Sequence, residues 1–323
     1  MKRIAVLTSG GDAPGMNACI RAIVKAAKSN NIETLGIYEG YTGLMEGKMK
    51  VLTTDYVDDI VGLSGTILKS ARSKLFRTEE GVKRAIRQAN SNGIEALIVI
   101  GGDGSFRGAC DLSKYGLPVI GVPATIDNDI AGTEYSIGVD TAVNVVTDTI
   151  SKFHDTARSL ISDTPRVFLI EVMGRNCGYI AIASTIAGGA DYCIVPEVPY
   201  DINHMCSHIK NKFEDGKAYN VVVVAEGASS VNDLKTQVDT VLNIESRTSI
   251  LGHLQRGGAP TVTDRFIASQ MAIRGVELLI EGKSNRMVGV IGGEAVDCGI
   301  YKGINDKNKI SEKLIKLKDI LII

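Results

Sequence analysis

The sequence predicts an α/β fold with two Rossmann-like domains, each built on a sheet of mostly parallel strands flanked by helices. Short β-branched runs alternate with longer segments in which apolar residues recur every three or four positions, and this alternation is typical of βα units. The chain has 323 residues, which suits about two domains of roughly 150 residues each. Its 35 glycines include clusters directly after predicted strands, where a backbone can approach a ligand closely.

The expected strands are short and almost wholly apolar, so they should lie in parallel sheets with both faces covered. They are residues 2–8, 32–38, 95–100, 118–122, 166–171, 192–195, 220–225 and 287–291. The segments of helical period are residues 17–29, 79–89, 140–156, 178–186, 202–213, 263–281 and 311–318, and another helix should follow the glycines at 101–104. Ligands of such sheets bind at the loops that leave the carboxyl ends of the strands.

The composition excludes several classes of protein. The 36 Lys and Arg balance 37 Asp and Glu, which argues against binding to nucleic acid or to a membrane surface through bulk charge. The apolar runs are about five residues long, whereas a membrane span needs about 18. The apolar stretch 4–7 is too short for a secretory signal, and the six cysteines are scattered without a C-x-x-C pair. We therefore expect a soluble cytoplasmic protein with reduced thiols and with neither nucleic-acid nor membrane partners.

Two glycine-rich loops are candidates for phosphate binding. Residues 9–17 follow the first expected strand and residues 101–105 follow the third, and each loop leads into a helix. The N-terminus of a helix offers N–H donors and a positive dipole end, which suit phosphate. Neither loop matches the Walker or the dinucleotide-binding pattern. An ordinary glycine-rich βα turn is the alternative for each loop alone.

A third loop places a hydroxyl and two carboxylates at one strand end. Thr125, Asp127 and Asp129 follow the strand that ends at residue 122, and Asp103 ends the preceding strand. Three neighbouring carboxylates repel each other, so the arrangement favours a divalent cation on one or two of them and a free base on another. A solvated turn around residues 127–129 is the alternative.

Cations at later strand ends point to a substrate phosphate, because arginine forks are its usual partners. These cations are Arg166, Arg175, Arg247 and Arg256. Surface ion pairs are the alternative for each arginine alone. His204 and His208 lie one helical turn apart and suggest a metal pair, although a solvated helix face is the favoured interpretation.

Six segments together resemble the bacterial ATP-dependent 6-phosphofructokinases in order and spacing, from residue 2 to about residue 300. They are residues 10–17, 70–72, 101–105, 125–129, 171–175 and 252–258. The resemblance implies a glycolytic kinase that uses Mg2+ and ATP to phosphorylate the 1-hydroxyl of fructose 6-phosphate. It also implies a homotetramer, an ATP-binding domain (1–138 with 256–305) and a fructose 6-phosphate-binding domain (139–255 with 306–323).

Individual roles are carried over from the family by position. Asp127 would accept the proton of the sugar hydroxyl and Thr125 would hold the phosphoryl oxygens. Asp103, supported by Asp129, would carry Mg2+, and Arg72 and Arg175 would neutralise the transferred group. The nucleotide contacts would be Gly11, Arg72, Ser73, Gly102, Asp103, Gly104 and Ser105.

The sugar phosphate would be bound by residues from both halves of the chain. Arg166, Arg247, His253 and Arg256 would hold it by charge and hydrogen bonds, with Arg166 and Arg247 supplied by a neighbouring subunit. Met173, Gly174 and Glu226 would shape the sugar pocket.

Three departures from the family pattern bear on these roles. The stretch 157–165 is about four residues longer than in compact bacterial members, Ser73 replaces a frequent aromatic residue, and Ala124 replaces a glycine. A pyrophosphate-dependent enzyme and a non-catalytic sugar-phosphate sensor are the alternatives. Pyrophosphate-using relatives tend to carry an acid at the position of Gly104 and a lysine at that of Ala124, so ATP is expected here.

The family also has an effector site between subunits that binds ADP or phosphoenolpyruvate. The matching positions are Arg21, Lys25, Thr54, His154, Asp191, Asp215 and Lys217. Thr54 and His154 stand where arginines are common, and Asp215 places a negative charge where a cation usually meets the phosphate. We therefore expect a weak or absent effector response.

Overall fold

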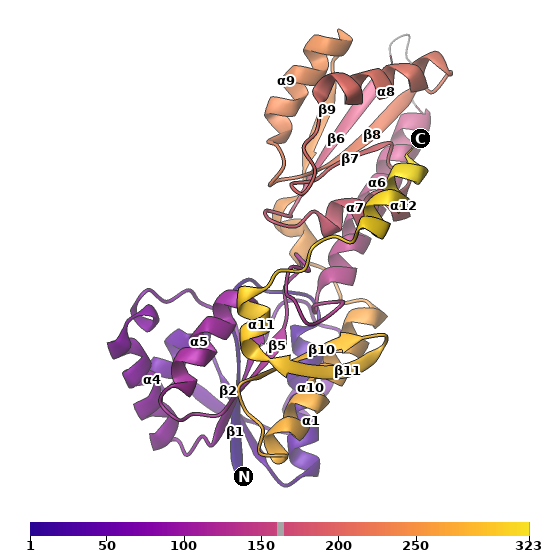
Figure 1. The fold of residues 1–323 in the computed structure, drawn as a ribbon. Helices are drawn as coiled ribbons and strands as arrows, with labels where there is room; N and C mark the ends of the chain where they lie inside the picture. Colours follow the sequence, from indigo (N-terminus) through magenta and orange to yellow (C-terminus); the bar gives the residue numbers. More distant parts are fainter. Residues whose placement is uncertain (160–164, 323) are drawn as a thin grey trace. The chain divides into compact units, whose positions relative to one another are not determined.

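The chain forms two compact units, drawn in Figure 1. The computed structural model describes residues 1–159 and 165–322. Unit 1 comprises residues 1–141 and 256–308, and unit 2 comprises residues 142–255 and 309–323. The longer stretch expected at 157–165 includes residues 160–164, which lie outside the described residues.

Unit 1 is built on a seven-stranded sheet in the order β11-β10-β5-β4-β1-β2-β3. The central strands are parallel; β4 and β5 are wholly buried and β1 is buried except at Arg3, because these strands are runs of β-branched and other apolar residues. Only the two edge strands, β3 and β11, are antiparallel to their neighbours. The strand bounds are β1 Arg3–Thr8, β2 Glu33–Ile37, β3 Met49–Leu52, β4 Ala96–Gly101, β5 Val119–Pro123, β10 Arg286–Ile291 and β11 Glu294–Gly299.

Helices cover both faces of this sheet. On one face α1 (Met16–Ser29) packs against α10 (Val262–Ile280). On the other face a single apolar core joins the sheet to α2 (Gly40–Glu46), α4 (Glu79–Ser91), α5 (Asp103–Ser113) and α11 (Ile300–Asn305). Short helical turns, α3 (Thr54–Val57), η1 (Asp58–Ile60) and η2 (Leu75–Arg77), connect β3 to α4.

Unit 2 has a four-stranded, fully parallel sheet in the order β7-β8-β6-β9. Its core on one face joins the sheet to α8 (Ile202–Glu214) and α9 (Val231–Leu242). The other face carries α6 (Val139–Ser159) and α7 (Tyr179–Gly188), and α12 (Glu312–Leu321) packs on α7. The strand bounds are β6 Arg166–Val172, β7 Tyr192–Ile194, β8 Tyr219–Ala225 and β9 Arg247–Ile250.

The predicted fold class, two layers of helices around parallel-rich sheets, is confirmed, and every expected strand is present to within two residues at each end. Three strands were missed: β3, β9 and β11. Their residues are largely half-buried or exposed, so they lack the apolar run that reveals a buried strand. All six cysteines are free, and no helix in the described ranges is long and apolar enough to cross a membrane.

Candidate active site

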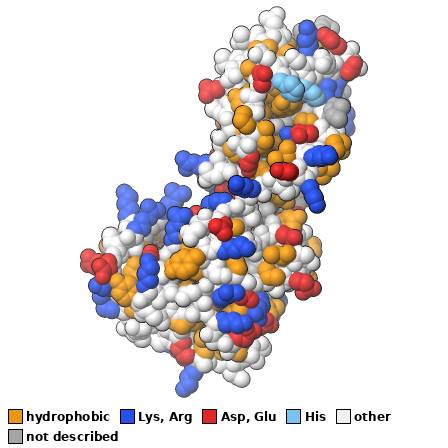
Figure 2. Space-filling model, viewed as in Figure 1, with side chains coloured by type: hydrophobic (Ala, Val, Ile, Leu, Met, Phe, Trp, Pro, Cys, Tyr) orange, Lys and Arg blue, Asp and Glu red, His pale blue; other side chains and the backbone are white. Residues whose placement is uncertain are grey.

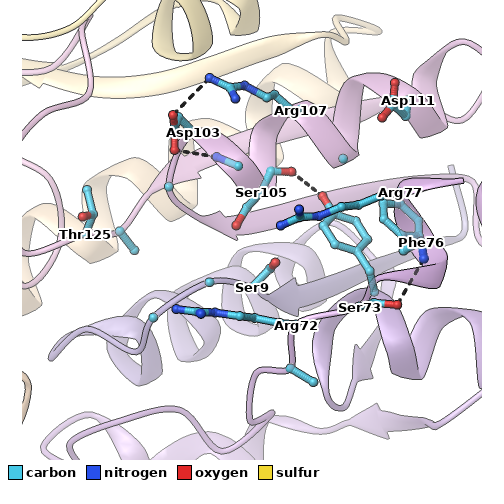
Figure 3. A pocket seen from close by; sticks show the side chains of 18 of the residues that line it. Ser9, Arg72, Ser73, Phe76, Arg77, Asp103, Ser105, Arg107, Asp111 and Thr125 are labelled. Carbon is cyan, nitrogen blue, oxygen red and sulfur yellow. Dashed lines mark hydrogen bonds and ion pairs between the residues drawn. The ribbon is translucent and has the colours of Figure 1, made fainter.

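The strand order of unit 1 reverses between β1 and β4, and the loops that leave these two strands line a cavity of about 610 Å³. Open α/β sheets bind their ligands at such a reversal, outside the carboxyl ends of the strands. Figure 3 shows Asp103 and Thr125 at one end of the cavity, and Phe76 and Asp111 at the other. The cavity therefore runs from the expected catalytic end along one side of α5.

Two of the predicted glycines leave open space in this cavity. No atom lies within 4 Å of a Cβ built on Gly102 or Gly104, and neither residue has a positive φ. The protein itself thus does not require glycine there, whereas a bound group that approaches the backbone would. Gly11 differs, since a Cβ there would collide with the guanidinium of Arg256, which donates to the Asp12 carbonyl (2.8 Å). The three glycines and Arg256 line the cavity. Asp12 is not among the lining residues.

An aromatic wall closes the end remote from Thr125. Tyr41 stacks on Phe76 with ring centroids 4.0 Å apart, and a Cβ on Gly108 would collide with both rings. Ser73 also lines the cavity, and its hydroxyl accepts a hydrogen bond from the Phe76 N–H (3.1 Å), which fixes the turn. Tyr41 and Phe76 both line the cavity and are each 5% exposed, so they present a small apolar surface to it.

Cations flank the cavity along its length. Arg72 and Arg77 extend across it toward the Thr125 end, and Arg107 on α5 pairs with Asp103 (3.3 Å) (Figure 3). Figure 2 shows Lys and Arg side chains gathered at the upper left of unit 1, in the region of α5 in Figure 1. A polyanion in the cavity would meet several guanidinium groups, which form strong charge-assisted hydrogen bonds with phosphate.

The loop after β5 is fixed by Asn128, which has a left-handed backbone (φ 52°). Its buried amide donates to the Glu134 carbonyl (2.9 Å) and accepts from the Ser136 N–H (3.0 Å), while the Ser136 hydroxyl donates to the Thr125 carbonyl (2.7 Å). The half-buried Thr125 and Asp127 lie within this clamp, and Ala124 is buried at the end of β5. Asp127 therefore lies on the same rigid loop as the cavity-lining Thr125.

Asp103 and Asp129 are joined by a lysine that the sequence did not single out. The ammonium of Lys307 lies 2.7 Å from Asp129 Oδ2 and 3.2 Å from Asp103 Oδ2. Burial lowers the pKa of Lys307, but Asp129 and Asp103 raise it by more, so its pKa lies above the ordinary value. One cation already contacts both carboxylates, so their spacing fits a single bridging ion. Mg2+ typically takes one or two carboxylates plus waters and substrate phosphates.

Unit 2 places most of its predicted residues at the carboxyl end of its sheet. Met173 and Gly174 follow β6, Glu226 follows β8, and His253 lies in the helical turn after β9. The wholly buried Gln255 accepts from the Met173 N–H (3.1 Å) and so ties two of these loops together. Gly174 needs its glycine, because its φ is 137° and a Cβ would collide with a carbonyl. Arg175, next in the chain, is exposed.

Arg166 and Arg247 lie at the opposite end of the same sheet. They are the first residues of the parallel strands β6 and β9, and the exposed Arg247 pairs with Glu245 (2.5 Å). Arg166 and Met173 are seven positions apart along and just beyond extended β6, which corresponds to about 23 Å. Within one unit 2, Arg166 therefore cannot join the residues at the carboxyl end, and Arg247, which is in register with Phe168, also lies nearer to the amino end.

The residues expected at an effector site are already engaged within their own units. Lys25 and Arg21 pair with Asp58, and Asp191, 3% exposed, pairs with Lys217. The two ring nitrogens of His154 lie 3.1 Å from the Tyr219 hydroxyl and 3.2 Å from the Gly188 carbonyl. Thr54 begins α3, and Asp215 caps the end of α8.

The histidine pair on α8 gains no support as a metal site. His204 lies 3.4 Å from the Tyr192 hydroxyl, and His208 is half-buried, which lowers its pKa. Among the described residues no group of three or more His, Cys, Asp or Glu is arranged to hold a metal ion.

Several cavity residues escaped the sequence analysis. Arg107 and Asp111 follow Asp103 at four-residue intervals on α5, so the helical period could have found them. Lys307 could not be found this way, because it lies 178 residues after Asp129 in the chain. The other missed lining residues are Tyr41, Phe76, Arg77 and Gly108, whereas Ser9, Gly10, Ala71 and Ala124 lie in segments or at positions that the sequence had already indicated.

Comparison with known proteins agrees with this geometry. A family model described as "Phosphofructokinase" matches residues 3–279. An ATP-dependent 6-phosphofructokinase from Clostridium tetani (strain Massachusetts / E88) is 49% identical over 317 residues, covering 98% of each chain. One from Clostridium botulinum (strain Loch Maree / Type A3) is 47% identical over 321 residues, covering 99% of each.

Solved structures share the fold. The Pichia pastoris phosphofructokinase in the T-state matches with a TM-score of 0.87 at 33% identity, covering 94% of this chain, which spans 35% of that longer chain. A pyrophosphate-dependent phosphofructokinase from Nitrosospira multiformis matches with a TM-score of 0.88 at 20% identity over 99% of this chain and 92% of that one, a likeness of fold alone. The family model and the near full-length relatives establish that this chain belongs to the phosphofructokinase family.

Proposed function

We propose that this chain is an ATP-dependent 6-phosphofructokinase that converts fructose 6-phosphate and ATP into fructose 1,6-bisphosphate and ADP, as a cytoplasmic enzyme of glycolysis. The observation that carries the proposal is the cavity of unit 1. It combines open glycine backbone, four arginines and the Thr125 loop with an aromatic wall at the end remote from Thr125. Near full-length relatives named for this activity support it.

ATP suits this cavity better than pyrophosphate does. The cavity continues past the glycines to the Tyr41–Phe76 stack, which a nucleoside can contact and pyrophosphate alone cannot reach while its phosphates lie beside Gly104. Gly104 leaves space for an α-phosphate, and Ala124 supplies no cation for a smaller donor. The preference for ATP thus follows from the absence of an acidic side chain at position 104 and of a lysine at position 124.

Phosphoryl transfer asks the protein mainly for positioning and charge neutralisation. The oxygen of the sugar 1-hydroxyl bonds to the γ-phosphorus, the bond from that phosphorus to the β–γ bridging oxygen breaks, and the hydroxyl proton passes to Asp127. Thr125 holds the phosphoryl oxygens, and Arg72 with Arg175 neutralises their charge. Gly11, Gly102, Gly104 and Ser105 contact the nucleotide phosphates.

Asp103 and Asp129 are the residues we assign to Mg2+, and the ammonium of Lys307 that contacts both carboxylates supports this assignment. Bound there, Mg2+ would screen the nucleotide phosphates and align them for transfer. The protein's own part is to supply the two oxygen ligands from separate loops.

Fructose 6-phosphate is assigned to unit 2 and Arg256, and ATP to unit 1. Met173, Gly174, Glu226 and His253 contact the sugar phosphate from the carboxyl end of the sheet. Arg166 and Arg247 lie at the amino end of that sheet, so we propose that they serve the site of a neighbouring subunit in a homotetramer.

The effector site is proposed to respond weakly. Asp58 already pairs with Lys25 and Asp191 with Lys217, so these two lysines have partners before any phosphate binds, whereas Arg21 lies 3.9 Å from Asp58. His154 contacts the Tyr219 hydroxyl and the Gly188 carbonyl and has no guanidinium fork to offer a phosphate in place of an arginine.

Product identification tests the proposed activity. The purified protein is incubated with Mg2+, fructose 6-phosphate and ATP labelled in the γ-phosphate, and the sugar product is analysed by ³¹P NMR and by its label. The label is expected in the phosphate group at carbon 1 of fructose 1,6-bisphosphate. Nucleotide binding without labelled sugar would instead support a non-catalytic sensor.

A further inference from the structure

Lys307 occupies the position between the two carboxylates assigned to the metal. Its ammonium contacts Asp103 at the start of α5 and Asp129 in the loop after β5, two segments that belong to different βα connections. Asp129 is 16% exposed and Asp103 is 35% exposed, so water screens their mutual repulsion only in part. Besides Lys307, Arg107 faces Asp103 at 3.3 Å.

The backbone around Lys307 is anchored independently of its ammonium. Residue 307 forms an isolated bridge with Ile130, and the Asn308 N–H donates to the Asp129 carbonyl (3.2 Å). The Asn308 side chain donates to the Thr133 carbonyl (2.9 Å). These contacts hold the segment beside the Asp129 loop, while the lysine side chain, 40% exposed, has room to swing away.

A divalent ion at this site would contact both carboxylates. It would compete with the ammonium of Lys307 for the same oxygens, because both are cations. We propose that Lys307 is a positioning residue and the built-in counter-ion of the metal site. Its ammonium keeps Asp103 and Asp129 at a bridging spacing in the free protein and is displaced when Mg2+ arrives with the nucleotide.

The exchange has a consequence for metal binding without nucleotide. A metal ion alone must displace the ammonium, whereas a metal ion that arrives with phosphates brings further ligands of its own. The free protein should therefore bind a divalent ion weakly, and removal of the ammonium should strengthen that binding. This inference rests on the assignment of Asp103 and Asp129 to the metal within the proposed function.

The test compares Lys307→Met, which removes the charge at similar length, with Lys307→Arg, which keeps it. Lys309→Met, at an exposed lysine two residues on, is the matched control. Mn2+ alone, without nucleotide, is titrated into each protein and free Mn2+ is followed by electron paramagnetic resonance. Two ion pairs at a partly exposed site correspond to about threefold to tenfold, so Lys307→Met should bind Mn2+ tighter by that factor. Lys307→Arg and Lys309→Met should stay within about twofold of the parent.

Equal affinities for the parent and Lys307→Met, including undetectable binding in both, would overturn the proposal, as would weaker binding by Lys307→Met. Thermal unfolding of each variant shows whether it is folded, and the anchored backbone predicts that all are. If Lys307→Met is unfolded, the same titration is made on Lys307→Gln, with the same criteria. Because the readout needs neither sugar nor ATP, a failed kinase assay and a failed Mn2+ result are separate findings.

Discussion

Asn128 illustrates how one side chain can fix a catalytic loop. Its left-handed backbone turns the chain sharply between Asp127 and Asp129, and its amide closes hydrogen bonds to Glu134 and Ser136. Asparagine tolerates this conformation better than most residues, which explains its place in the turn. The side chains on either side are thereby held in a defined arrangement, as transfer of a phosphoryl group requires.

Replacement of Asp127 by Asn tests the proposed proton acceptor. The amide keeps the shape but cannot take the hydroxyl proton, so kcat should fall by roughly 10² to 10⁴ while KM for both substrates changes little. Steady-state kinetics with a coupled assay give both constants. Asp233→Asn, at an exposed carboxylate on α9, is the control and should match the parent. A kcat for Asp127→Asn within about threefold of the parent would contradict the assignment.

At the scale of single residues, the sequence indicates the glycines and carboxylates of the site because they directly follow apolar strands. Gly102, Asp103 and Thr125 all line the cavity as their positions predict. Lys307 and the Tyr41–Phe76 stack depend on packing between distant segments, and no local pattern contains that information.

Among the elements, α5 carries the nucleotide side of the cavity on one stripe. Asp103, Arg107 and Asp111 are spaced by four residues, so they lie on the same helix face and line the same cavity. Strands buried on both faces were predicted because each is a continuous run of apolar residues. The edge strands β3 and β11 were not predicted, because half-exposed strands lack such a run. Whether a strand can be recognised in this sequence therefore depends on how fully the strand is buried.

A network of charges joins α10 to the edge of the sheet. Asp297 on β11 receives hydrogen bonds from Arg286 (2.7 Å) and Arg274 (3.1 Å), and Arg274 also pairs with Glu281 (2.7 Å). Burial alone would raise the pKa of Asp297, but the two arginines lower it below its ordinary value of 3.8. The stabilisation from this lowered pKa is present above about pH 4 and is lost as the pH falls through the folded-state pKa.

Asp297→Asn tests this network. The variant should lose roughly 1 to 3 kcal/mol of unfolding free energy at pH 7, and the difference from the parent should shrink as the pH falls below about 4. Urea unfolding at a series of pH values measures both. Glu294→Gln, at an exposed position on the same strand, should show neither effect. A difference that is constant from pH 7 to pH 3 would rule out the ion pairs as its source.

For the whole molecule, the two ends of the unit 2 sheet carry different parts of the proposed substrate site. Arg166 and Arg247 begin their strands, while Met173 and Glu226 follow theirs. The parallel-rich sheets and the active-site loops could be predicted from the sequence. The placement of these residues at opposite ends of one sheet could not, because it depends on the strand register. It supports sites shared between subunits.

Subunit complementation tests shared sites. Asp127→Asn and the double variant Arg166→Ser with Arg247→Ser should each be nearly inactive, since one lacks the proposed base and the other the substrate cations. Co-expression forms mixed oligomers in which some sites take Asp127 from one subunit and both arginines from another. Recovery toward about a quarter of parent activity is expected for random pairing. Activity no higher than the sum of the separate variants would mean that each subunit builds its site alone.

The effector prediction concerns the assembled enzyme. Charge-assisted hydrogen bonds contribute about 1.5 to 3 kcal/mol each, so missing arginines at Thr54 and His154 and the added charge of Asp215 should weaken effector binding by several orders of magnitude. Phosphoenolpyruvate and ADP are titrated at subsaturating fructose 6-phosphate. The half-saturation point should hardly move, and a shift of tenfold or more at sub-millimolar effector would show a working site.

The choice of phosphoryl donor distinguishes an ATP-dependent from a pyrophosphate-dependent enzyme. Fructose 6-phosphate and Mg2+ are supplied with either ATP or pyrophosphate, and production of fructose 1,6-bisphosphate is followed in a coupled assay over a range of donor concentrations. Because Gly104 leaves room for the nucleotide and Ala124 offers no cation to the smaller donor, kcat/KM should be at least about 100-fold higher with ATP. Comparable kcat/KM for the two donors, or turnover with pyrophosphate alone, would contradict the account.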